Sequence, residues 1–137
     1  MSTATQFPTL SAARAGFKDL LDAAEEGRPA TVRREHKVSA VVDAARLRCM
    51  LAAGRPAEAQ IVAEAGGWSI FLPGLPLAAD AASFDEVLVE MVLVLREYAD
   101  DWEDHLLHAP NHVNNWGLVQ LIALSDDDQL RAWLVGE

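Results

Sequence analysis

The stretch from Thr9 to Leu51 constrains the fold most, because its hydrophobic pattern changes from helical spacing to short runs rich in β-branched residues. The helical part predicts one amphipathic helix from Ser11 to Glu26 with a single apolar face. Gly27 should end this helix, because glycine readily takes the left-handed conformation just past a helix. The apolar positions are Leu10, Ala13, Phe17, Leu20, Leu21 and Ala24.

Two strand-like runs follow the predicted helix. They cover Ala30 to Arg34 and Val38 to Val42, and the polar connection Glu35-His36-Lys37 between them predicts a β-hairpin. A second helix should begin near Asp43. Residues 1 to 10 should form an edge strand or an ordered arm, because Pro8 limits ladder pairing there. Two apolar side chains of this arm should be buried, Phe7 and Leu10.

About the first 50 residues resemble the Phd/YefM class of bacterial antitoxins. The pattern of that class is S-x-A-R, an apolar helix, E-x-G-x-P, a strand ending in Arg, a turn, and an apolar strand with A-V-V; it matches the run SAARAGFKDLLDAAEEGRPATVRREHKVSAVVDAARL. The resemblance implies an α/β homodimer whose N-terminal segments bind operator DNA and whose remainder holds a toxin, by implication a RelE-like ribonuclease. The family turn usually contains Gly, whereas this chain has Glu35-His36-Lys37.

The net charge of −10 hides two opposite halves. Through residue 60 there are nine Lys or Arg against seven Asp or Glu, a net charge of +2, and from residue 61 there are two against fourteen, a net charge of −12. The first half suits phosphate, and the second suits a cationic protein. The alternative is an acidic protein without a partner.

Basic residues of the first half form two candidate DNA-binding clusters. Arg14, Lys18 and Asp22 recur at every fourth position of the predicted helix, which by itself also fits a solvated face. The second cluster lies at the far end of the hairpin, and together the two could bind phosphate. The Phd/YefM resemblance implies operator contacts for Arg14 and Arg34. The predicted DNA-binding residues are Arg14, Lys18, Arg33, Arg34 and Lys37.

The C-terminal part should fold, unlike the poorly ordered tail of simple Phd/YefM members. It contains all four tryptophans and long aliphatic runs, which are too apolar for a disordered segment. We therefore divide the chain into a dimerisation and DNA-binding unit at 1–55 and a mainly helical, acidic toxin-binding region at 56–137 with one or two short strands. Pro56 to Ala65 is predicted as a short helix, and Trp68 to Leu72 as a strand.

A long helix should follow Ser83, which is a good N-cap with Glu86 three residues later. Apolar residues keep helical period from Phe84 to Leu106, for about six turns. Because Val89, Leu93 and Val94 widen its apolar surface, the helix should be either deeply buried or shared with a partner. We predict toxin-binding roles for Tyr98, Asp101 and Trp102, although the two aromatic residues could equally serve the C-terminal core.

The same region resembles HicB-like antitoxin modules over about 40 residues. The likeness lies in the tryptophan-containing strand, the P-G-L-P loop and the S-F-D-E helix start. Two further helices are predicted, one over Asn111 to Leu124 and one after the acidic cap Ser125-Asp126-Asp127-Asp128.

Signals of catalysis and of cofactors are few. Three histidines, His105, His108 and His112, follow Asp101 and Asp104, but Pro110 interrupts the helix and solvated histidines fit better than a metal site. The sequence has no phosphate-binding loop, nucleophile elbow or zinc-binding cysteine pair, so we predict no enzyme, no cofactor and no metal. Cys49 is the single cysteine, which excludes an intrachain disulfide and favours a buried thiol over a reactive one.

We expect a cytoplasmic protein with no membrane association. No run approaches the roughly 20 apolar residues that cross a bilayer, and the N-terminus lacks the layout of a secretory signal. The leading hypothesis is an α/β (α+β) antitoxin of a type II toxin–antitoxin system that neutralises a RelE-like toxin and represses its own operon. The alternative is a free-standing transcriptional regulator or scaffold without a toxin, and a third is an enzyme that uses the histidines.

Overall fold

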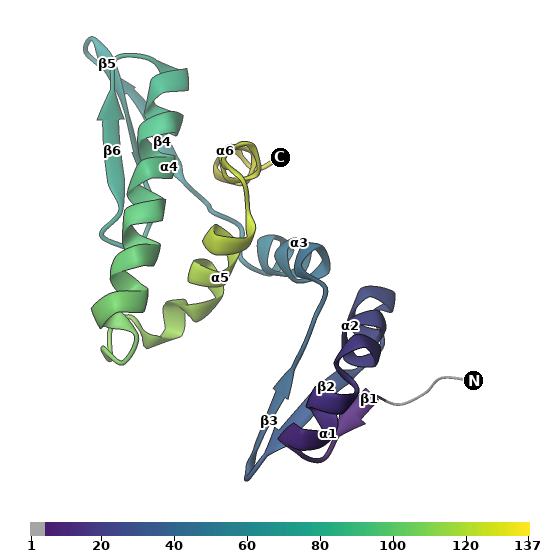
Figure 1. Ribbon diagram of the computed structural model, residues 1–137. Coiled ribbons are helices and arrows are strands. Elements are labelled where there is room, and N and C mark those ends of the chain that lie inside the picture. Colours follow the sequence, from purple (N-terminus) through teal and green to yellow (C-terminus); the bar gives the residue numbers. More distant parts are fainter. Residues whose placement is uncertain (1–4) are drawn as a thin grey trace. The chain divides into compact units, whose positions relative to one another are not determined.

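The computed structural model describes residues 5–137 (Figure 1). The chain forms two compact units, and the boundary between them falls between Leu47 and Arg48. Unit 1 ends at Leu47, and unit 2 runs from Arg48 to Glu137. Both units combine helices with one three-stranded sheet, so the α/β class expected from the sequence is confirmed. Of the edge strand or arm expected over residues 1 to 10, residues 1–4 lie outside the described residues, and Thr5–Phe7 form a strand at the edge of the first sheet. No helix within residues 5–137 is long and apolar enough to cross a membrane.

Unit 1 is a sheet with two short helices on one face (Figure 1). The central strand pairs in parallel with the first strand and antiparallel with the third. The core is small: three side chains of α2, Leu20, Ala23 and Ala24, pack against Ala30 of the central strand. The elements are β1 (Thr5–Phe7), α1 (Leu10–Ala15), α2 (Phe17–Glu26), β2 (Ala30–Arg34) and β3 (Lys37–Ala40), followed by α3 (Ala44–Gly54).

The single helix predicted over Ser11 to Glu26 is two helices that meet at Gly16. The ring of Phe7 lies so close to Gly16 that a Cβ there would collide with it. The expected single apolar face is also wrong, because the break at Gly16 changes the direction in which the flanking positions point. Phe7 is half-buried, whereas Leu10, which was predicted to be buried, is exposed. Phe17 and Leu21, which belong to the predicted apolar face, are also exposed.

The ends of α2 and β2 are the ones predicted. Gly27 has a φ of 84° and its N–H caps the last turn of α2, so the predicted stop is confirmed. The hairpin closes through Glu35 and His36 without glycine, and Glu35 takes a left-handed φ of 56°. Arg34 and Lys37 face each other across the first pair of the ladder. β3 ends at Ala40, two residues before the predicted end.

Unit 2 contains an antiparallel sheet of three strands, where one or two strands were expected from the sequence. The segment predicted as a helix from Pro56 to Ala65 contains the first strand. Its apolar residues Ile61 and Ala63 point to the same face with period two, and Gly66, at a φ of 81°, makes a tight turn into the next strand. The strands are β4 (Gln60–Glu64), β5 (Gly67–Phe71) and β6 (Ala78–Ala81).

The long helix α4 (Phe84–Asp101) forms the centre of unit 2, with β5 and β6 on one side and α5 and α6 also packed against it (Figure 1). Ser83 Oγ accepts the Glu86 N–H at 3.2 Å, which confirms the predicted N-cap. Beyond Asp101 the chain continues as a π turn (Trp102–Leu106). It then forms a 3₁₀ turn (Val113–Asn115), α5 (Trp116–Leu124) and α6 (Asp127–Val135).

Arg96 ties α4 to the end of α5. Its guanidinium donates to the carbonyl oxygens of Ile122 and Ser125 at 2.6 and 2.9 Å, and to the carboxylate of Asp127 at 2.8 Å. The carbonyls at a helix C-terminus have no partner within the helix, so this cation satisfies the end of α5. The last helix starts with a capping box between Asp126 and Gln129, in the acidic segment that the sequence predicts as a cap.

Candidate partner and nucleic-acid surfaces

The tip of the unit 1 hairpin concentrates positive charge. Arg34 and Lys37 are exposed and form a cross-strand pair on one face of the sheet, whereas Arg33 is exposed on the opposite face beside Val38. Like charges directly opposite each other destabilise a hairpin. An anionic partner at the tip would relieve that repulsion, so the tip is suited to a polyanion such as DNA.

Arg14 lies in the last turn of α1 and is exposed. The helix α1 contacts β2, and Figure 1 shows α1 and the hairpin tip at the same end of unit 1. The four cations Arg14, Arg33, Arg34 and Lys37 make no salt bridge within residues 5–137. Four such cations at one end of a small unit form a surface that can bind a polyanion.

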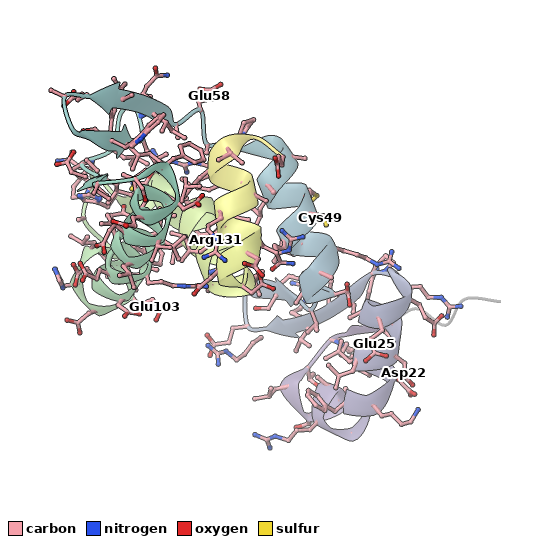
Figure 2. The ribbon with its side chains drawn as sticks, turned by 90° about the horizontal axis from the view of Figure 1, so that it is seen from above. Asp22, Glu25, Cys49, Glu58, Glu103 and Arg131 are labelled. Atoms are coloured by element: carbon pink, nitrogen blue, oxygen red, sulfur yellow. The ribbon has the colours of Figure 1, made fainter. Side chains whose placement is uncertain are left out.

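Lys18 does not continue the stripe from Arg14, because the two residues belong to different helices on either side of Gly16. Its Nζ lies 2.6 Å from a carboxylate oxygen of Asp22. The hydrogen bond and charge of Asp22 raise the pKa of Lys18 above its ordinary value. Lys18 is therefore charged but already paired, which reduces its value for binding phosphate. Figure 2 shows Asp22 and Glu25 on the same helix.

Of the three residues predicted to bind a toxin, the structure exposes only Asp101. Tyr98 and Trp102 retain 6% and 4% of their accessible surface and belong to the core of unit 2. Of the two roles considered for these aromatic residues, the structure places both side chains in the C-terminal core. A partner cannot reach them while unit 2 stays folded as described.

Tyr98 is the centre of a chain of hydrogen bonds. Arg55 Nη2 lies 3.3 Å from Asn115 Oδ1, and Asn115 Nδ2 donates to the phenol oxygen of Tyr98 at 2.8 Å. Because Arg can only donate, it fixes the orientation of the Asn115 amide, and the phenol oxygen that accepts from this amide also shares a hydrogen bond with His112 Nδ1 at 2.9 Å.

Two indole groups extend the network. Trp102 Nε1 donates to the carbonyl oxygen of His112 at 2.9 Å, and Trp133 Nε1 donates to the carbonyl oxygen of Arg55 at 2.9 Å. The network thus joins the end of α3, the π turn, the 3₁₀ turn and α6. Its separation in sequence reaches 78 residues, between Arg55 and Trp133, so no local pattern could have predicted it.

The histidines do not converge. His112 belongs to the Tyr98 network, and His105 Nδ1 lies 3.4 Å from an oxygen of its neighbour Asp104. Within residues 5–137, no three His, Cys, Asp or Glu side chains are grouped as metal ligands would be.

Cys49 is exposed, so the expectation of a buried thiol is wrong. No side chain of α3 is buried, and Figure 2 shows the sulfur of Cys49 projecting outward from the helix.

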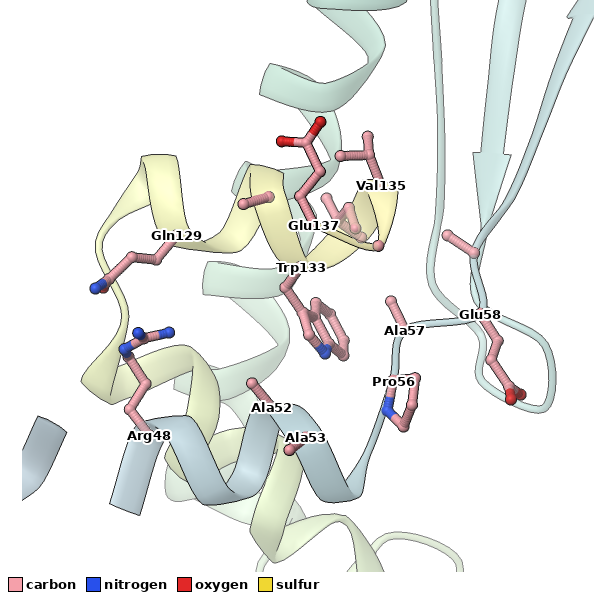
Figure 3. Close-up of a pocket in the computed structure, with 14 residues that line it drawn as sticks. Arg48, Ala52, Ala53, Pro56, Ala57, Glu58, Gln129, Trp133, Val135 and Glu137 are labelled. Carbon is pink, nitrogen blue, oxygen red and sulfur yellow. The ribbon is translucent and has the colours of Figure 1, made fainter. Parts of the chain in front are cut away.

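A groove in unit 2 had no signal in the sequence. It has a volume of about 640 Å³ and lies between the end of α3, the connection to β4, and α6 (Figure 3). Alanines form much of its wall, and the Trp133 ring lies among them. Arg48, Glu58, Gln129 and Glu137 are its polar lining residues. They present no nucleophile paired with a base, and nothing in the groove indicates what it would bind.

A second feature was only partly visible in the sequence, the exposed side of α4. It carries a row of carboxylates interrupted by Val89 and Leu93, which are 46% and 53% exposed. The helical period separates this side from the buried stripe of Val87, Met91 and Leu95.

No family model and no curated protein matches the chain. Among solved structures, it is similar to an antitoxin part of a proposed toxin/antitoxin system from Syntrophomonas wolfei subsp. wolfei. The two share 21% identity with a TM-score of 0.79, over 93% of this chain and 95% of the other. The chain therefore has the fold of that antitoxin across both units.

Proposed function

We propose that the protein is the antitoxin of a type II toxin–antitoxin system. The observation that carries the proposal is the fold, which it shares over nearly its whole length with an antitoxin. A match that includes unit 1 and unit 2 is more informative than a match of one small unit, because it covers both the basic and the acidic parts. In this proposal unit 1 binds operator DNA and unit 2 binds the toxin, in the cytoplasm.

Repression of its own operon is proposed for the basic end of unit 1. The exposed cations at the hairpin tip and in α1 support it, and the Phd/YefM resemblance assigns operator contacts to two of them, Arg14 and Arg34. Phosphate contacts give affinity, whereas specificity requires contacts to base edges. Arg14 and Arg34 are the proposed base-reading residues, and Arg33 and Lys37 are proposed to contact phosphate.

A homodimer through unit 1 is proposed because this unit has little core of its own. Only four of its side chains make up the buried cluster. Five large apolar side chains remain exposed in it: Leu10, Phe17, Leu21, Val38 and Val42. A second copy would cover part of this apolar surface, and it would also place two basic ends on one DNA duplex.

The toxin is proposed to be a RelE-like ribonuclease. Such a protein needs a cationic surface to hold RNA, and the residues from 61 onward carry a net charge of −12. This complementarity favours rapid and selective association with a basic partner.

Co-expression tests the proposal. The chain is produced together with the protein encoded by the adjacent gene, and the complex is isolated through a tag on the chain alone. If the chain is an antitoxin, the protein from the adjacent gene stays bound through purification, and co-expression of the chain restores the growth of cells that this protein alone inhibits. A free-standing regulator or scaffold shifts promoter DNA in a gel but neither retains the neighbouring protein nor restores growth. That result would reject the antitoxin proposal.

A further inference from the structure

The exposed side of α4 forms an unpartnered helix face with an apolar centre. Its members recur at intervals of three and four residues, so they lie along one side of the helix. All are exposed, and we refer to them as the α4 outer face: Glu86, Val89, Glu90, Leu93, Glu97, Asp100 and Asp101.

No cation within the described residues compensates these carboxylates. None of them forms a salt bridge within residues 5–137. Arg96, the only basic residue of α4, is committed to the end of α5 and to Asp127. The outer face therefore presents only negative charge to its surroundings.

The distribution of these charges lowers the stability of the helix. Glu86 with Glu90, and Glu97 with Asp101, are like-charged pairs one turn apart, which repel each other. Asp100 and Asp101 stand in the last turn of α4, which contains no basic residue to offset their charge. An incoming cationic surface would remove this repulsion.

Val89 and Leu93 are inconsistent with a purely solvated helix face. They lie one turn apart between Glu86 and Glu97, and about half of each side chain is exposed. An apolar centre with a charged rim is the composition of a protein–protein interface. Nucleic acid would be repelled by the carboxylates, and a small cation would gain nothing from the aliphatic pair.

We propose that the α4 outer face docks the toxin through a surface on which Lys or Arg residues flank an apolar ridge. This inference rests on the proposed function, and it names the contact surface in place of the buried Tyr98 and Trp102. Asp101 belongs to this surface, and the apolar contact is made by Val89 and Leu93.

The test measures the affinity of the purified chain for the protein encoded by the adjacent gene. The variant Val89→Gln/Leu93→Gln removes the apolar centre and keeps good helix formers on an exposed surface, so folding should be preserved. The variant Glu90→Lys/Glu97→Lys reverses two charges. Each should weaken binding by about tenfold or more, and the charge reversal should also reduce the dependence of affinity on salt.

Two matched controls separate this face from general effects. Met50→Gln removes an aliphatic side chain that is 66% exposed on α3. Glu64→Lys/Glu137→Lys makes the same change in net charge at other exposed sites of unit 2. Both controls should bind within about twofold of the parent, because they lie outside the α4 outer face. Circular dichroism of all variants verifies the fold, and single Leu93→Gln replaces the double variant if that one unfolds.

The outcomes distinguish the two proposals. If the parent binds its neighbour and the α4 variants bind equally well, the outer face is not the docking surface, while the antitoxin function stands. Equal weakening by Glu64→Lys/Glu137→Lys would show a diffuse charge effect and would also overturn the inference. If the parent itself binds no neighbour, the proposed function fails, and the docking surface fails with it.

Discussion

The phenol oxygen of Tyr98 and Nδ1 of His112 are 2.9 Å apart, in a network that also holds the buried amide of Asn115. Tyr98 and His112 are 14 positions apart in sequence, and the contact closes the loop that carries Pro110. Tyr98 thus forms hydrogen bonds with two side chains that follow the π turn, so its hydroxyl group fastens the loop after the π turn to α4.

Removal of that hydroxyl should therefore destabilise unit 2. Tyr98→Phe leaves the Asn115 amide without its acceptor in a buried site, at a cost of about 1–3 kcal/mol in the free energy of unfolding. Urea denaturation followed by tryptophan fluorescence measures this loss. In a double-mutant cycle, Asn115→Ala should cost less in the Tyr98→Phe background than in the parent. Additive costs would contradict the coupling.

Truncation of Trp102 and of Trp116 to alanine should have very different effects on the stability of unit 2. Trp102→Ala empties a core site that is 4% exposed, so it should cost about 3–5 kcal/mol. Trp116→Ala is the matched control, because that ring is 51% exposed and its loss should change stability by about 0.5 kcal/mol or less. Thermal unfolding checks both. Equal melting of the two variants would contradict the burial of Trp102.

A substitution at the turn residue Glu35 should be able to raise the stability of unit 1. A side chain in the left-handed region costs about 1–2 kcal/mol that glycine avoids, although glycine also loses more entropy on folding. Glu35→Gly should therefore stabilise unit 1 by up to about 1 kcal/mol, whereas Glu35→Val should destabilise it, because a β-branched residue tolerates this region poorly.

The readout for the Glu35 variants has to come from unit 1. All four tryptophans and Tyr98 lie in unit 2, so aromatic fluorescence does not report on unit 1. Far-UV circular dichroism or amide exchange of the hairpin is needed. The left-handed conformation of Glu35 is contradicted if Glu35→Gly lowers the stability of the hairpin while Glu35→Val leaves it unchanged.

The basic residues of unit 1 should contribute to DNA binding in two different ways, by reading bases or by contacting phosphate. Arg14→Ala and Arg34→Ala should reduce the preference for the upstream promoter over random DNA, because one bidentate base contact is worth about 1–3 kcal/mol of discrimination. Lys37→Ala should weaken binding to both DNAs equally and flatten the salt dependence. Lys18→Ala should act in the same way as Lys37→Ala but more weakly, because Asp22 already pairs with Lys18.

Gel shifts across salt concentrations, on variants with matched melting curves, test these roles. Arg28→Ala is the control, since Arg28 precedes β2 at the end opposite the hairpin tip and is ion-paired with Glu26 at 3.1 Å. Unchanged promoter affinity in both arginine variants would remove the DNA-binding proposal and leave the toxin-binding one.

The sequence predicted correctly those boundaries and elements that are determined by residues close together in the chain. Gly27 stops α2 through its own backbone preference, and Ser83 caps α4 through a neighbouring N–H. The long apolar period from Phe84 also predicted the central helix, because a sustained pattern leaves no alternative. The strand from Ala30 to Arg34 has the predicted bounds.

Features with distant causes were missed. The helix break at Gly16 depends on the ring of Phe7, which the sequence does not place. β4 was taken for a helix because a short apolar run has no clear period. The burial of Tyr98 requires Asn115 and Arg55, which lie 17 residues after and 43 residues before it along the chain and meet it only in the folded unit.

The π turn from Trp102 to Leu106 restricts changes in chain length. A π turn contains one residue more than the α turn that it replaces. Deletion of Glu103 would let this segment close as an ordinary α-helix, but it would also shorten the chain that connects Trp102 to His112. The shorter connection would move the His112 carbonyl away from Trp102 Nε1. Homologues that keep this network should therefore keep the number of residues between Trp102 and His112.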